Sequence, residues 1–143
     1  MQPFYLLYGE ESFLVERALR IVQQRCAAEP RPGVWRTIWA PEDASRLGAA
    51  LDDLASPLLF GGGTTLVVRH VEALAEAAQE DILARLDGVG GGSRLVLVGA
   101  AVDARRRLVT ACQRAGAAYA FPPLTDAAAV RRWVTQLARD RGH

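Results

Sequence analysis

Short apolar runs alternate with helical patterns along the chain, and this alternation limits the possible folds more than any other feature. Apolar strands joined by helices are typical of a parallel sheet with both faces covered. We therefore predict an α/β fold of three layers, with a five-stranded parallel sheet and helices on both faces. Arg36 and Thr37 make the second run less apolar, which favours an edge strand. The predicted strands are Phe4–Tyr8, Val34–Trp39, Thr64–Val68, Arg94–Val98 and Ala117–Phe121.

A helix is predicted after each strand, because apolar residues recur there three or four positions apart. We expect Pro41 and Asp43 to open the second helix, and Asp103 to cap the fourth, which Gly116 ends. Thr125 or Asp126 is expected to cap the last. The predicted buried stripes are Leu14, Ala18, Ile21 and Val22; Leu47, Ala50, Leu51 and Leu54; Leu74, Ala78, Ile82 and Leu86; Leu108, Ala111, Cys112 and Ala115; and Val130, Trp133, Val134, Leu137 and Ala138.

Composition bounds the class of protein without selecting a function. The 143 residues suit one domain, and their formal net charge of +1 neither favours nor excludes a nucleic-acid partner. Cys26 and Cys112 match no zinc pattern and are expected to be reduced, buried thiols in helices. The chain shows no signal peptide and no apolar run of about 18 residues. These features predict a cytoplasmic protein without a membrane partner.

The turn after the first strand argues against nucleotide binding. In a P-loop this turn carries two spaced glycines and a Lys. Here Gly9 is followed by Glu10 and Glu11, which would repel phosphate, and the chain contains no Lys. The third strand runs into Arg69 and His70, so no carboxylate closes it to hold magnesium. We therefore predict a degenerate nucleotide site, with no cofactor and no metal.

No other motif predicts catalysis. Only two histidines are present, His70 and His143, and no Gly-x-Ser-x-Gly motif occurs. His70 ends a strand, where we expect it to be solvated or locally hydrogen-bonded. The run Arg105-Arg106-Arg107, expected in the first turn of a helix, is interpreted as a solvated face or as a contact with phosphate or a partner. The predicted set of catalytic residues is therefore empty.

An apolar loop is the most informative segment. Leu58, Leu59 and Phe60 follow the helix stop Ser56-Pro57 and precede three glycines. The residues could lie under the sheet edge as core. Alternatively, they could form an exposed plug for a partner's pocket, since apolar anchors of this kind dominate interface energies.

Three stretches of the chain form an ordered set: Tyr5–Leu14; Pro57–Gly62 running into Leu66–Arg69; and Phe121-Pro122 followed by Leu124, Val130 and Trp133. In this order and spacing they resemble the delta subunit of the bacterial DNA polymerase III clamp loader, and the resemblance covers essentially all 143 residues. The sister subunits of that loader carry a four-cysteine zinc module and a Ser-Arg-Cys motif, whereas here Ser93-Arg94 is followed by Leu95.

This resemblance implies an N-terminal AAA+ domain, with a P-loop-NTPase-like fold and a degenerate ATP site, that works in DNA replication. It implies binding to the beta sliding clamp through Leu58, Leu59 and Phe60, which helps to open the clamp. Pro57 departs from the family pattern beside this plug. The other loader subunits would be contacted through lid and collar domains that this chain lacks. DNA would be contacted only indirectly, and the domain itself would catalyse nothing.

Two alternatives stay open at this point. One is a nucleotide-binding domain that hydrolyses ATP or GTP. The other is a regulatory or interaction domain of flavodoxin-like build, in which the apolar loop is part of the core.

Overall fold

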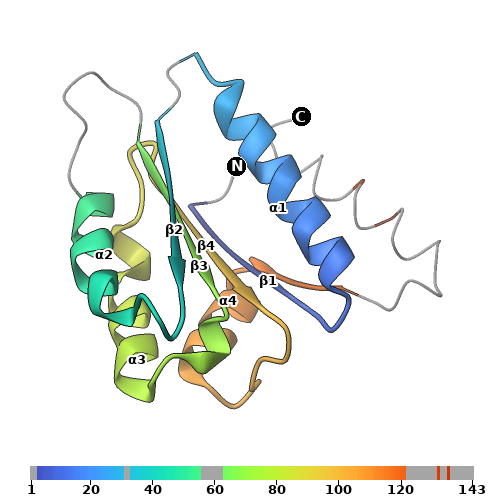
Figure 1. Ribbon diagram of the computed structural model, residues 1–143, viewed down its shortest axis with the longest axis vertical. Helices are drawn as coiled ribbons and strands as arrows, with labels where there is room; N and C mark the ends of the chain where they lie inside the picture. The colour runs from blue at the N-terminus through green and yellow to red at the C-terminus, as the bar shows by residue number, and fades with distance from the viewer. Residues whose placement is uncertain (1–2, 31–32, 56–62, 122–131, 133–134, 136–143) are drawn as a thin grey trace.

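The computed structural model describes residues 3–30, 33–55, 63–121, 132 and 135, and these form a five-stranded parallel sheet flanked by helices (Figure 1). The last predicted helix lies almost entirely outside this described part. The strands are β1 (Phe4–Tyr8), β2 (Val34–Trp39), β3 (Thr64–Arg69), β4 (Arg94–Gly99) and β5 (Ala118–Ala120). The helices are α1 (Ser12–Ala27), α2 (Leu47–Ala55), α3 (Glu76–Arg85) and α4 (Arg107–Arg114), with the short 3₁₀ turns η1 (Ala44–Arg46), η2 (Val71–Ala73) and η3 (Leu86–Gly88).

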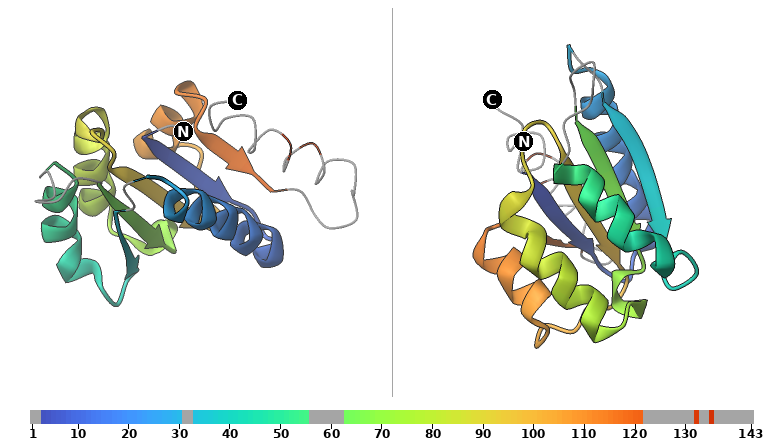
Figure 2. Two further views of the ribbon diagram at one scale, coloured as in Figure 1. Left: turned by 90° about the horizontal axis from the view of Figure 1, so that it is seen from above. Right: turned by 90° about the vertical axis from the view of Figure 1, so that its left-hand side faces the viewer.

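The predicted three layers are confirmed. Helix α1 covers one face of the sheet, and α2, α3 and α4 cover the other, as Figures 1 and 2 show. Alternate strand residues supply the two cores: Leu66 packs toward α2 and α3, while its neighbour Val67 packs toward α1. Both faces of the central strands are therefore apolar, which explains why those strands read as uninterrupted apolar runs.

The strand order is β2-β3-β4-β1-β5. Strand β4 lies between β1 and β3, and β2 is an edge strand, as its composition predicts. A flavodoxin-like sheet would place β1 between β2 and β3. The flavodoxin-like alternative is therefore wrong for this chain.

The predicted second helix begins later than expected. Asp43 does not open it, because its carboxylate accepts the backbone N–H of Trp39 at 3.1 Å and so closes the end of β2. A turn and η1 follow, and α2 begins only at Leu47. The predicted stripe of α2 is confirmed, since all four of its residues are buried.

The predicted start of the fourth helix is also wrong. Asp103 caps a turn rather than a helix: its carboxylate accepts the backbone N–H of Arg105 at 2.9 Å, and α4 begins at Arg107. Val109 is buried in α4, whereas Ala115 of the predicted stripe is exposed. Gly116 ends α4 with a φ of 69°, in the left-handed region that favours glycine.

Cys26 and Cys112 are free, buried thiols in α1 and α4, as predicted. Burial raises the pKa of Cys112 to about 12, because a thiolate loses its hydration in an apolar surrounding. In the part of the chain that the structure covers, no helix is long and apolar enough to cross a membrane.

The raised pKa predicts that Cys112 is inert in the folded protein. In a Cys26→Ser variant, Cys112 is expected to react with a disulfide reagent at about pH 8 roughly a thousandfold more slowly in the folded than in the unfolded chain, because the thiolate is the reactive species. Absorbance at a series of denaturant concentrations measures the two rates. Equal rates with and without denaturant would contradict the burial of this thiol.

Candidate functional site

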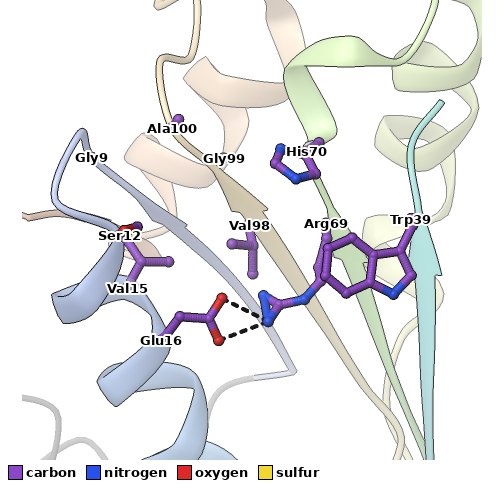
Figure 3. A pocket seen from close by; sticks show the side chains of 10 residues that line it. All are labelled: Gly9, Ser12, Val15, Glu16, Trp39, Arg69, His70, Val98, Gly99 and Ala100. Atoms are coloured by element: carbon purple, nitrogen blue, oxygen red, sulfur yellow. Dashed lines mark hydrogen bonds and ion pairs between the residues drawn. The ribbon is translucent and has the colours of Figure 1, made fainter.

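A small pocket lies at the carboxyl ends of the strands, where open α/β sheets commonly bind ligands (Figure 3). Its cavity volume is about 90 Å³. The N-terminus of α1 forms one wall, the end of β4 forms the back, and the ends of β2 and β3 form the other wall. The lining residues are Gly9, Ser12, Val15, Glu16, Trp39, Arg69, His70, Val98, Gly99 and Ala100.

Gly9 serves strand packing in this structure. A Cβ atom at Gly9 would lie 2.7 Å from the carbonyl oxygen of Phe121, and the glycine φ is 152°. The Gly9 N–H donates to the carbonyl of Gly99 at 3.2 Å. The glycine is therefore required by the close approach of the chain just beyond β5, and this requirement holds without any bound phosphate.

The rest of the P-loop pattern maps onto residues that cannot hold phosphate. Counted from Gly9, the second glycine of the pattern falls on Leu14, the Lys on Val15 and the Ser or Thr on Glu16. Leu14 and Val15 are buried in the core under α1. At the position of the magnesium-binding hydroxyl stands a carboxylate. The turn at Gly9, Glu10 and Glu11, which was predicted to be a degenerate nucleotide turn, is thus followed by a first turn of α1 that lacks the Lys and the hydroxyl of a P-loop.

An ion pair crosses the pocket. Arg69 at the end of β3 donates from Nη2 to both carboxylate oxygens of Glu16 on α1, at 2.6 and 2.7 Å. To do so it passes over Val98 of β4, as Figure 3 shows, because β4 separates β3 from β1 by two strand spacings of roughly 10 Å. The Arg69 side chain is 15% exposed and the Glu16 side chain 48%, so solvent reaches the pair mainly from the side of the carboxylate.

An aromatic ring completes this arrangement. The guanidinium carbon of Arg69 lies 4.6 Å from the centroid of the Trp39 ring, a cation–π distance. The Trp39 ring is in turn 5.9 Å from the ring of His70. We call Glu16, Arg69 and Trp39 the arginine bridge. Within the bridge, the guanidinium of Arg69 is engaged by Glu16 and Trp39. Little positive charge is therefore left to attract a phosphate.

His70 is exposed, as predicted, and takes a left-handed conformation with φ 58° and ψ 47°. Its Nδ1 lies 3.8 Å from Oε1 of Glu72. Within the described ranges no three His, Cys, Asp or Glu side chains are placed to hold a metal ion. The contact of His70 with Glu72 is local, since the two residues are two positions apart.

The basic run Arg105–Arg107 is paired with carboxylates. Arg106 and Arg107 lie 3.4 and 3.3 Å from Glu76 and Glu80 of α3, and Arg105 binds Asp103 at 3.1 Å. The hydrogen bond from Arg105 lowers the pKa of Asp103. Only Arg107 lies in the first turn of α4, so the predicted placement is correct for Arg107 and wrong for Arg105 and Arg106. The pairing favours the solvated face over a phosphate site.

The predicted clamp-binding residues Leu58, Leu59 and Phe60 lie outside the described residues. The flanking elements agree with the prediction, since α2 ends at Ala55 and β3 begins at Thr64. Sequence reasoning missed the arginine bridge. Its signal was faint: Trp39 and Arg69 close two neighbouring strands, and Glu16 follows one turn into α1.

Comparisons with known proteins bear on the fold. No protein-family model matches the chain, and no curated protein sequence matches it. Among solved structures, the P-loop NTPase domain of the sigma-54 transport activator from E. coli is similar, with a TM-score of 0.51 and 20% sequence identity over 87% of this chain and 86% of that one. The chain is thus an α/β domain of the P-loop NTPase fold.

The arginine bridge is expected to stabilise the folded domain. In a double-mutant cycle of Glu16→Gln and Arg69→Met, we expect a coupling free energy of unfolding of about 1 kcal/mol, at the upper end for pairs that solvent reaches, because Arg69 donates to both carboxylate oxygens and its side chain is mostly buried. The exposed pair Arg36–Asp53 is the control, with an expected coupling below about 0.5 kcal/mol. Denaturant melts measure both. Additive effects of Glu16 and Arg69 would contradict a stabilising bridge.

We also predict that the domain does not bind ATP with magnesium. The reasons are the missing Lys, the carboxylate of Glu16 at the hydroxyl position, and the engaged Arg69. Isothermal calorimetry should show no binding heat, both for the natural chain and for a Glu16→Ala/Arg69→Ala variant, because neither supplies the missing ammonium. Micromolar binding that a Gly9 substitution abolishes would overturn this expectation.

Proposed function

We propose that this chain is a clamp-binding domain of the clamp-loader delta type, which contacts the beta sliding clamp in DNA replication and helps to open it. The observation that supports the proposal is the arginine bridge, which lies in the pocket at the carboxyl ends of the strands, beside the turn where a P-loop would present its phosphate-binding donors. A domain whose own side chains engage the cationic group of this pocket is suited to binding a partner rather than to hydrolysing a nucleotide. The domain is therefore not an ATPase by itself.

The region around the apolar segment supports the same role. Gly63, which directly precedes β3, is buried, and a Cβ atom there would lie 2.3 Å from the backbone of Gly92. A Cβ at Gly33 would lie 1.6 Å from the Gly63 carbonyl oxygen. Backbones at the amino ends of β2, β3 and β4 therefore pack in direct contact. Leu54 near the end of α2 and Thr64 at the start of β3 are both buried, so the residues on either side of positions 56–62 are packed in the described part of the domain.

The two regions lie at opposite ends of the strands. The arginine bridge is at the carboxyl ends, and the apolar segment is attached at the amino end of β3. A loss of nucleotide chemistry at the carboxyl ends therefore does not impair binding at the amino ends.

The proposed partners follow from this arrangement. The beta sliding clamp binds Leu58, Leu59 and Phe60, and the other clamp-loader subunits bind the further domains that the resemblance implies. Contact with DNA is indirect, because the arginines of the densest basic run are paired with carboxylates. The competing proposal is an interaction domain in which the apolar segment is core.

Leu59→Ala and Phe60→Ala test the proposal. If the side chains are interface anchors, Phe60→Ala should weaken clamp binding by about 2 kcal/mol or more, roughly thirtyfold, with little effect on the melting temperature. If they are core, the same change should cost about 3–5 kcal/mol of stability through the cavity it leaves. Thermal melting and surface plasmon resonance against the clamp of the same genome measure both quantities.

Ile82→Ala is the matched control, because Ile82 is a large, fully buried apolar residue in α3, an element that is not attached to residues 56–62. It should lower the melting temperature and leave the clamp affinity of the folded fraction unchanged. A Phe60→Ala protein that behaves like this control, with lowered melting and unchanged affinity, would refute the plug.

A further inference from the structure

The outer side of α1 combines positive charge with an exposed aromatic ring. Phe13, Arg17, Arg20 and Gln24 are exposed and lie four, three and four positions apart, so they share one side of the helix. The buried residues of α1 lie on the opposite side and pack against the sheet. Phe13 is 59% exposed, more than any other large apolar residue in the described part of the chain. We call Phe13, Arg17 and Arg20 the α1 stripe.

The charge of the α1 stripe is not balanced by any ion pair in the described part of the chain. The only carboxylate of α1 is that of Glu16, which Arg69 engages. Arg46 and Arg114 are also exposed without an ion pair there, but neither shares its element with a second such arginine. The arginines that do have an ion-paired carboxylate are Arg36, Arg69, Arg85, Arg94, Arg105, Arg106 and Arg107. Unbalanced positive charge therefore gathers on this side of α1.

The spacing of the two arginines fits two carboxylates that stand one helical turn apart. Residues three positions apart on a helix have Cβ atoms about 5–6 Å apart, which is also the spacing of two acidic side chains at positions i and i+3 of a partner helix. An arginine donates two parallel hydrogen bonds to a carboxylate. Phe13 lies one turn nearer the N-terminus of α1, where its ring offers an apolar contact. The α1 stripe is therefore complementary to a helix with one acidic turn and one apolar turn.

A nucleic acid is a less favourable occupant of the α1 stripe. The affinity of a protein for nucleic acid depends on how many phosphates its cations neutralise, and this stripe supplies only Arg17 and Arg20. The formal net charge of the chain is +1, so no strong field adds to these two cations. An acidic protein segment, in contrast, needs only the two carboxylates that the arginines can bind.

We propose that the α1 stripe binds an acidic amphipathic helix of another protein. Two Glu or Asp residues of that helix, three positions apart, pair with Arg20 and Arg17, and an apolar residue four positions further on packs against Phe13. The two helices run antiparallel, the orientation in which their dipoles attract each other. Helix α1 covers the face of the sheet opposite α2 (Figure 2), and the proposal does not depend on clamp binding.

Amide chemical shifts of the full chain test the proposal with a defined probe. The probe is an alanine-based helical peptide of about 18 residues, which carries Glu at two positions three apart and Leu four positions after the second Glu. It should shift the amides of residues 13–24 saturably, with a Kd below about 1 mM. A peptide with Gln in place of both Glu residues should bind at least about tenfold more weakly, because it loses the charge-assisted hydrogen bonds.

Variants of the α1 stripe locate the binding. Arg17→Gln/Arg20→Gln should weaken the binding of the acidic peptide at least about tenfold, and Phe13→Ala about fivefold. These positions are exposed, so the melting temperature should hardly change. Arg46→Gln/Arg114→Gln is the matched control, because it removes the same charge from exposed arginines elsewhere, and it should leave the affinity unchanged.

Four results would overturn the proposal. They are an equal loss of affinity in the control variant, an unchanged affinity in Phe13→Ala, shifts that do not saturate up to about 1 mM peptide, and tighter binding of oligothymidylate than of the acidic peptide at the same amides.

Discussion

The ion pair between Glu16 and Arg69 joins parts of the fold that the strand order keeps apart. Because β4 lies between β1 and β3, the helix that follows β1 and the end of β3 face each other across an intervening strand. In a nucleotide-binding protein of this fold, the phosphates and their metal lie across this gap. Here an arginine spans it, with both carboxylate oxygens of Glu16 at one end and the face of Trp39 alongside.

This arrangement gives the carboxyl ends of the strands contacts that need no bound ligand. Arg69 and Glu16 neutralise each other's charge, and Gly9 is required by the contact with Phe121. Contacts within the chain thus stabilise the carboxyl ends of the strands. At the amino ends of the strands, backbone contacts join Gly33, Gly63 and Gly92. Gly63 directly follows the segment proposed to bind the clamp. Binding there needs a rigid framework rather than a catalytic centre.

Much of the fold follows from the sequence, because burial on both faces leaves a local signature. The run Leu95–Val98 is apolar at every position and is indeed a central strand, and the stripe Leu47, Ala50, Leu51 and Leu54 marks the buried face of α2. The strand order left no such signature, since each strand–helix unit has the same pattern of apolar residues whatever its position in the sheet. The predicted starts of two helices were wrong for a related reason. Asp43 and Asp103 are residue types that commonly cap helices, but the Asp43 carboxylate closes the end of a strand and the Asp103 carboxylate caps a turn.

The candidate site was less predictable than the fold. Local reasoning found what the turn at Gly9 lacks, because a missing Lys can be read from the sequence alone. It did not find the arginine bridge, since Glu16 and Arg69 are 53 positions apart in the sequence and meet only once the strands are ordered. The hydrogen bond from the Ala100 N–H to the Glu72 carboxylate was hidden in the same way, because the two residues are 28 positions apart in the sequence.

Sedimentation of the purified chain with the sliding clamp of the same genome, with and without ATP and magnesium, tests the central claim most directly. A clamp-binding domain whose nucleotide site is filled by its own side chains should form a complex of the same affinity in both conditions. Independent sedimentation of the two proteins at tens of micromolar, or a complex that forms only when ATP and magnesium are present, would contradict the account.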